Sequence, residues 1–238
     1  ILFDMLESTP PLLPVSFSMC GRFSQTKPAE TLSSTFELAV PEWTPRYNIA
    51  PTQAVPTVTF SSQEKRQFKL LRWGLVPAWA KDLAIGARLI NARAETVAEK
   101  PSFRSAFKRR RCLILADGFY EWQRSQGKKQ PYYIQVTQGQ PFAFAGLWEH
   151  WQGSDTEIES CTILTTQANE LMQPVHDRMP VILSPQSYDL WLNPATLGEQ
   201  LQELLHPYRA QDMQRYPVSS FVNSVNHESP ECVERLSA

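Results

Sequence analysis

The residue with the best surroundings for nucleophilic chemistry is Cys20, in the run Met19-Cys20-Gly21-Arg22-Phe23. Gly21 lets the backbone bend tightly beside it, and Arg22 can stabilise a thiolate or hold a phosphate. A free cysteine is more often a small buried apolar side chain than a nucleophile. If Met19 is the initiator and is removed, however, Cys20 becomes the first residue and carries a free amine as well as a thiol.

An amino-terminal cysteine offers two nucleophiles on one carbon frame. Its α-amine, with a pKa of about 8, attacks an aldehyde to give a Schiff base, and the thiolate then closes a five-membered thiazolidine. An amide nitrogen cannot do this, so residues 1–18 must be absent. In that segment Asp4 and Glu7 replace the basic region of a signal peptide, and prolines interrupt any membrane helix. We expect a leader outside the mature protein, with a misassigned start favoured over self-cleavage before Cys20.

Two other residues can supply acid-base chemistry. Glu121 ends an apolar stretch between Tyr120 and Trp122, where partial burial would raise its pKa and suit it to act as a base. A solvated carboxylate at a strand end is the plainer interpretation. His176 follows Pro174 in a stiff loop and is a candidate general acid, or else a loop histidine bonded to backbone.

Several polar and basic residues are candidates for binding nucleic acid. Asn91 and Arg93 alternate with alanines, so both can point to one side of an extended segment and contact a sugar-phosphate, or stabilise a loop. With Arg22 and the run Lys108-Arg109-Arg110-Arg111 they would form a basic groove, although such runs are usually solvated turns. The groove must be local because the formal net charge is −1. Three tryptophans, Trp73, Trp79 and Trp122, could stack on bases, although isolated tryptophans more often pack in the hydrophobic core.

Composition argues against several other classes of protein. The four cysteines form no CxxC pair, so we expect no zinc site, no other metal and no cofactor. A chain of 238 residues does not need disulfides, which indicates a reducing, cytoplasmic compartment. No stretch reaches the roughly 20 apolar residues of a membrane helix. We therefore expect a soluble monomer that does not bind membranes.

The elements that must position these residues are mostly strands. The runs 54–60 and 66–73 flank a polar turn as the arms of a hairpin do. Further strands are expected, from their β-branched and aromatic residues, at 111–122, 131–137, 142–149 and 160–166. Helices are expected at 28–38, at 94–99, at 184–192 with Ser184 as cap, and at 197–205. Without a βαβ rhythm, the predicted class is α+β around a mostly antiparallel sheet with short peripheral helices.

Six motifs follow one another along the chain: Met-Cys-Gly-Arg-Phe, Arg-Tyr-Asn-Ile-Ala-Pro, Trp-Gly-Leu-Val-Pro-x-Trp, Asn-Ala-Arg-x-Glu, Ala-Asp-Gly-Phe-Tyr-Glu-Trp and His-Asp-Arg-Met-Pro. In these motifs the chain resembles the SRAP (SOS response-associated peptidase) family. The resemblance implies a single domain over residues 19–226, with a curved, barrel-like antiparallel sheet, and a tail at 227–238. It also implies a DNA-damage protein that binds single-stranded DNA and links covalently to the ring-opened aldehyde of an abasic site, by lyase-like Schiff-base chemistry.

The resemblance assigns roles to individual residues. Cys20 would be the nucleophile, and Asn91 would orient the opened sugar through its amide. Glu121 would be the base near the α-amine, and His176 would be the acid that protonates the sugar oxygen. Arg22 and Arg93 would hold flanking phosphates. Weaker candidates for lining the DNA groove are Asn48, Trp79, Thr165 and Arg178. Ala80 stands where the family sometimes has a second aromatic, which weakens the case for base stacking there.

Three other functions fit parts of the same pattern. A peptidase, or hydrolase, acting in trans would use Cys20, His176 and Glu121 as nucleophile, base and orienting group. It would leave the free amine and the basic run without a role. A reader of modified DNA would use the groove without covalent chemistry, and a structural domain would use the polar clusters to stabilise loops. Only covalent capture of abasic DNA would survive a denaturing gel.

Overall fold

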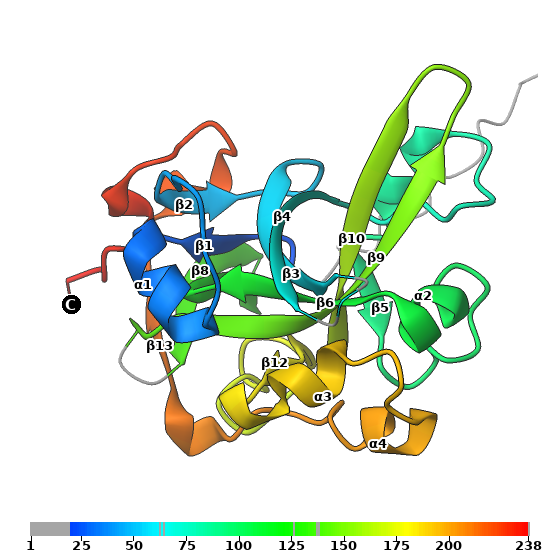
Figure 1. Ribbon diagram of the computed structural model, residues 1–238. Helices are drawn as coiled ribbons and strands as arrows, with labels where there is room; N and C mark the ends of the chain where they lie inside the picture. Colours follow the sequence, from blue (N-terminus) through cyan, green and yellow to red (C-terminus); the bar gives the residue numbers. More distant parts are fainter. Residues whose placement is uncertain (1–19, 62, 64, 126, 137–138, 238) are drawn as a thin grey trace, which may run out of the picture.

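Five strands of the described part of the chain close into a barrel (Figure 1). The computed structural model describes residues 20–61, 63, 65–125, 127–136 and 139–237, so the expectation of a leader at residues 1–18 lies outside it. In ring order the barrel strands are β3 (Ala54–Phe60), β4 (Arg66–Trp73), β10 (Glu157–Gln167), β9 (Phe142–Gln152) and β6 (Arg111–Ala116). Neighbours are antiparallel except β4 and β10, which run parallel. The predicted class and its barrel-like sheet are confirmed.

A second sheet carries the segment that begins at Cys20. In sheet order its strands are β13 (Met213–Pro217), β8 (Lys128–Val136), β7 (Gly118–Ser125), β1 (Phe23–Gln25) and β2 (Arg46–Ile49). Three short strands add to the barrel: β5 (Asn91–Arg93) and β11 (Arg178–Pro180) pair with β10, and β12 (Ile182–Leu183) pairs with β9.

Alternate residues of the barrel strands belong to two different cores. In β6, Ile114 packs in the cluster that includes Phe23 and Phe119 of the second sheet. The next residue, Leu115, packs with Trp191 and other residues of the surrounding helices. Successive strand residues point to opposite faces, so a strand that is buried on both faces reads as a continuous apolar run. This is why 112–116 is apolar throughout.

The helices are short and lie around the sheets (Figure 1). They are α1 (Ala29–Phe36), α2 (Arg104–Arg109), α3 (Tyr188–Leu192) and α4 (Gly198–Gln202). Single 3-10 turns occur at Leu83–Arg88, Pro185–Ser187, Ala210–Asp212, Ser220–Asn223 and Pro230–Val233. The last of these packs on β2, and Ser220–Asn223 packs on β8, which brings the chain end to the second sheet. Among the described helices, none has the length and apolar character needed to cross a bilayer.

Most of the predicted elements are present, and the hairpin at 54–60 and 66–73 is confirmed to the residue. The predicted helix at 94–99 is wrong. That segment forms turns: the Ala94 N–H still pairs with the Thr165 carbonyl of β10, and the N–H groups of Thr96 and Glu99 donate to carbonyls three residues back instead of four. Ser184 precedes a helical turn, but its hydroxyl pairs with that of Ser187 instead of capping backbone.

The single strand predicted at 111–122 is also wrong, because the chain changes sheets at Asp117. The Asp117 carboxylate is buried and accepts hydrogen bonds from the Ser24 hydroxyl at 2.7 Å and from the Thr26 N–H at 3.0 Å. A buried carboxylate needs several donors, and here they come from β1 and the residue after it. The motif Asp-Gly is thus a corner between two sheets, and β7 restarts at Gly118.

Candidate active site

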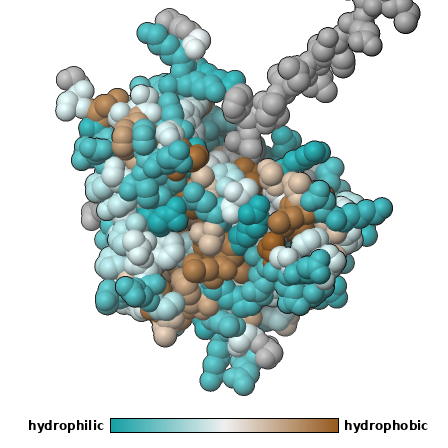
Figure 2. All heavy atoms as spheres, turned by 90° about the horizontal axis from the view of Figure 1, so that it is seen from above, coloured by the Kyte–Doolittle hydropathy of each residue, from teal (hydrophilic) through white to brown (hydrophobic). Residues whose placement is uncertain are grey.

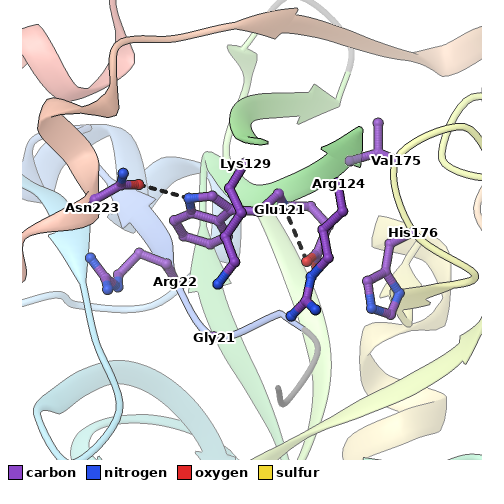
Figure 3. Close-up of a pocket in the computed structure, with 9 residues that line it drawn as sticks. Gly21, Arg22, Glu121, Arg124, Lys129, Val175, His176 and Asn223 are labelled. Atoms are coloured by element: carbon purple, nitrogen blue, oxygen red, sulfur yellow. Dashed lines mark hydrogen bonds between the residues drawn. The ribbon is translucent and has the colours of Figure 1, made fainter. Parts of the chain in front are cut away.

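A cavity of about 700 Å³ adjoins the segment that begins at Cys20 (Figure 3). Its walls come from that segment, from the β7–β8 hairpin, from the loop before β11 and from the turn at Ser220–Asn223. The lining residues are Gly21, Arg22, Glu121, Trp122, Arg124, Lys129, Val175, His176 and Asn223. Two of the predicted catalytic residues, Glu121 and His176, therefore share one cavity.

The register between β1 and β7 places Cys20 next to Glu121. Phe23 pairs with Phe119 in antiparallel fashion, and the Tyr120 N–H donates to the Arg22 carbonyl at 3.0 Å. Continuing this register toward the start of the chain puts Gly21 opposite Glu121. The Cys20 backbone nitrogen then donates to Glu121 Oε2 at 3.1 Å.

Cys20 holds its nitrogen, and not its sulfur, against the carboxylate. The residue is 1% exposed and has a φ of 41°, a left-handed backbone conformation that is uncommon for a residue with a side chain. Burial, and to a smaller extent the neighbouring Glu121, raises the pKa of the Cys20 thiol well above its ordinary value. At neutral pH the sulfur is a thiol in this environment.

The Glu121 carboxylate is suited to accept a proton. It is 7% exposed, and burial raises its pKa above the ordinary value. His176 and the N–H groups of Cys20 and Trp122 oppose this shift, whereas Asp177 adds to it. A carboxylate whose charged form is disfavoured by burial is a stronger base than one in water.

His176 is oriented by its own loop. The Arg178 N–H donates to His176 Nδ1 at 3.1 Å, and Asp177 Oδ1 lies 2.9 Å from the same nitrogen. The Arg178 N–H needs an acceptor at Nδ1, which in neutral His176 leaves the proton on Nε2, whereas the Asp177 carboxylate favours a proton on Nδ1. The loop is fixed to β7 because Gln123 Nε2 donates to the Pro174 carbonyl at 2.8 Å.

Arg22 is held in place by β2 and by the carboxy-terminal segment. Its Nη1 donates to Asn48 Oδ1 at 2.7 Å and to the Val222 carbonyl at 3.0 Å, and its guanidinium lies over the Trp122 ring. Asn48 is fully buried and donates in turn to the carbonyls of Val222, Ser224 and His227. Asn48 is therefore placed to position Arg22 and does not line the cavity itself.

The other sequence-predicted residues lie outside the cavity lining. Asn91 and Arg93 share one face of β5, and Ala92 between them is buried in the core. Thr165 is buried and its carbonyl accepts from Arg178 Nη2 at 2.7 Å. The structure thus places Asn91, Arg93 and Thr165 along the β5–β10 edge.

Of two further residues predicted to line the DNA groove, Arg178 is engaged in an ion pair and Trp79 is exposed. Both guanidinium nitrogens of Arg178 donate to the Glu95 carboxylate, so this side chain is engaged in a bidentate ion pair. Trp79 is 59% exposed and lines a separate, mostly apolar hollow with Ile85. An exposed tryptophan is available for stacking. On the face seen in Figure 2, apolar residues lie exposed in several patches among hydrophilic ones.

Only part of the basic run 108–111 is available for the groove that its sequence suggested. Arg111 is 2% exposed and donates to the backbone carbonyls of Phe107, Lys108, Trp191 and Asn193. Burial lowers its pKa to about 10. Arg110 forms an ion pair of 2.6 Å with Glu149. Half of the run therefore stabilises the fold, and Lys108 and Arg109 remain exposed.

Sequence reasoning missed three polar lining residues, Arg124, Lys129 and Asn223. Arg124 and Lys129 pair directly across the β7–β8 hairpin, and Asn223 Oδ1 accepts from Trp122 Nε1 at 2.8 Å. The pattern Glu-Trp-Gln-Arg followed by Gly-Lys-Lys would have indicated the hairpin and its basic pair. Nothing local in the sequence indicates Asn223, because its contact with Trp122 spans 101 positions.

Comparison with known proteins adds four findings. The sequence model of the SOS response associated peptidase (SRAP) family matches residues 19–225. The chain is 48% identical over 223 residues to the abasic site processing protein YoqW of Bacillus subtilis, covering 91% of this chain and 99% of the relative. It is 32% identical over 231 residues to the abasic site processing protein HMCES of Xenopus tropicalis, covering 82% of this chain and 67% of the relative. A crystal structure of a protein from Bacteroides thetaiotaomicron is similar with a TM-score of 0.81 and 28% identity, and covers 92% of this chain and 100% of that one.

Proposed function

The chain belongs to the SOS response associated peptidase family, and on that premise we propose that it captures abasic sites in single-stranded DNA covalently through Cys20. The names of YoqW and HMCES support the abasic site as the lesion. The observation that carries the proposal is the contact of 3.1 Å between the Cys20 nitrogen and buried Glu121.

The active form is a chain that begins at Cys20, which converts the nitrogen beside Glu121 from an amide to an amine. Glu121 takes a proton from this amine as it adds to the C1 aldehyde of the opened sugar. Loss of water gives the imine. The Cys20 thiol then adds across the imine, forming a C–S bond and returning its proton to nitrogen, which closes the thiazolidine.

His176 supplies the acid side of the same reaction. With Nδ1 accepting from backbone, Nε2 carries the proton that is donated to the sugar ring oxygen as the ring opens. Asn91 and Arg93 along β5, together with Arg22, bind the sugar and the flanking phosphates. The weaker candidates Trp79, Thr165 and Arg178 belong to the same DNA surface.

The geometry supports amine-first chemistry over a peptidase that acts in trans. A thiol peptidase needs a thiolate that is paired with an imidazole. Here burial and Glu121 both raise the pKa of the Cys20 thiol, and the atom held against the base is nitrogen. We place the functional domain at residues 19–226 and its action at the nucleoid in the cytoplasm.

The test is covalent capture on a denaturing gel. Protein that begins at Cys20 is incubated with a labelled single-stranded oligonucleotide that contains one abasic site, and a heat-stable, slower band is expected. Cys20→Ala should abolish the band. Cys232→Ala is the matched control, because Cys232 is also buried but belongs to the carboxy-terminal segment, and it should leave the band intact.

Two outcomes contradict the proposal. Turnover of a peptide substrate without any band would favour the peptidase, and reversible binding without a band would favour a DNA reader. Intact mass adds an independent check, because crosslinking by protein that still carries residues 1–18 would remove the role of the free amine.

A further inference from the structure

The β7–β8 hairpin places two cations opposite each other beside Glu121. Arg124 and Lys129 are directly paired in the antiparallel register, both are exposed, and both line the cavity. Figure 3 shows the two side chains reaching from the hairpin over the cavity. Two neighbouring cations that face one cavity create a local positive potential, which favours a ligand with negative charge.

The rest of the cavity lining adds one cation, Arg22, and one carboxylate, Glu121. Arg22 is partly buried, and its Nε has no hydrogen-bond partner among the residues described. Of the described lining residues, Glu121 alone carries a carboxylate, and that carboxylate is directed to the Cys20 nitrogen. A cavity with three cations and one carboxylate favours a ligand with negative charge.

We propose that Arg124 and Lys129 form an anion subsite for a phosphate that belongs to the same molecule as the aldehyde captured at Cys20. The inference rests on the proposed function and extends its substrate class. A DNA strand and a free sugar phosphate share the required chemistry, a phosphate near an aldehyde. Capture of a free phosphorylated aldehyde would be an activity that needs no DNA.

The reaction with a free aldehyde balances without any further reactant. The Cys20 amine adds to the carbonyl carbon, the carbonyl oxygen leaves as water, and the thiol adds to the resulting imine with transfer of its proton to nitrogen. The protein gains the mass of the aldehyde less one water. Intact mass spectrometry therefore reports the adduct directly.

The experiment compares two probes, 2-deoxyribose 5-phosphate and 2-deoxyribose, with protein that begins at Cys20. Each rate of adduct formation is divided by the rate of the same probe with free cysteine, which corrects for different amounts of open-chain aldehyde. We expect the corrected rate to be about tenfold higher for the phosphate at low ionic strength, and the advantage to shrink as salt is added.

A double variant, R124Q with K129Q, tests the subsite itself. It should remove the phosphate advantage and leave the corrected rate of 2-deoxyribose unchanged. The control is K108Q with R109Q, which removes the same charge from the exposed end of α2 and should keep the advantage. Melting temperatures of all variants establish that each is folded.

A parallel arm with the abasic oligonucleotide separates the sources of the phosphate. Slower capture of both 2-deoxyribose 5-phosphate and the abasic oligonucleotide by the double variant supports the subsite for either source of phosphate. Slower capture of the oligonucleotide alone supports it for a DNA phosphate. If the double variant changes neither while the parent forms the DNA band, the subsite is wrong and the proposed function stands. If the parent forms neither adduct nor band, the proposed function fails and the inference fails with it.

Discussion

Replacing Glu121 by Gln tests its contact with Cys20 through protein stability, without any DNA. In the full chain the Cys20 nitrogen is a neutral amide, and burial raises the pKa of Glu121. The folded state then binds more protons than the unfolded state between the unfolded pKa of about 4.3 and the raised folded pKa. The free energy of unfolding therefore falls as pH rises through this window, and it stays lower above it. Gln carries no charge and so avoids the cost of burying an ionised carboxylate. E121Q should therefore be more stable than the parent protein at pH 7, by about 1.4 kcal/mol for each unit by which the pKa of Glu121 is raised.

The sign should reverse in a chain that begins at Cys20. Its nitrogen is an ammonium group at pH 7, and two unit charges 3.1 Å apart attract by about 5 kcal/mol at an effective dielectric constant near 20. Desolvation offsets much of this attraction, but removal of one partner leaves the other charge buried and unpaired. We expect E121Q to be less stable than its parent by about 2 kcal/mol in this chain.

The assay is urea unfolding followed by circular dichroism, at pH 7, for both chain lengths with Glu121 and with Gln. Glu170→Gln is the control in each chain, because Glu170 is exposed and its replacement should change the free energy of unfolding by less than about 0.5 kcal/mol. The same sign of effect in both chains would refute the reasoning, since the Cys20 nitrogen would then not contact the carboxylate.

Three further changes test other parts of the site and its supports. His176→Asn should slow capture of abasic DNA by about 100-fold in a gel time course, with little change in melting temperature; an unchanged rate would remove His176 from the mechanism. Arg111→Met leaves four carbonyls without a donor and should lower the free energy of unfolding by at least about 3 kcal/mol, whereas Arg109→Met on the exposed face should not. Gly118→Ala would put a methyl group 2.1 Å from Tyr133, and urea unfolding should show a loss of about 3 kcal/mol or more; a stable variant would show that the corner at Asp117 can move.

The sequence predicted the fold well where a local pattern decides the structure. The hairpin at 54–60 and 66–73 was predicted to the residue, because its turn is polar, its first arm is apolar or β-branched, and its second arm carries apolar residues among polar ones. The apolar stretch from Arg111 onward was predicted as one strand, since periodicity alone cannot reveal a change of sheet. That change depends on donors to Asp117 from Ser24 and Thr26, which lie far away in the chain.

The distribution of charge around the candidate site was hard to predict from the sequence. The run 108–111 looked basic in sequence, yet Arg111 binds backbone carbonyls in the core. Three cations do line the cavity: Arg22, and the pair Arg124 and Lys129 of the β7–β8 hairpin. A count of basic residues does not distinguish an arginine that satisfies backbone carbonyls from one that faces a ligand, because the difference lies in long-range contacts.

The prediction for Glu121 also depended on long-range contacts that the sequence does not reveal. The sequence suggested a raised pKa because aromatic residues flank Glu121, and the direction is confirmed. Burial raises the pKa of the carboxylate, and the main groups that oppose this rise are His176 from a distant loop and the Cys20 N–H from the start of the described chain. Its basicity therefore depends on how these segments pack, and a change that loosens either one should alter the chemistry and the stability of the protein together. That coupling is what the opposite signs expected for E121Q in the two chain lengths would measure.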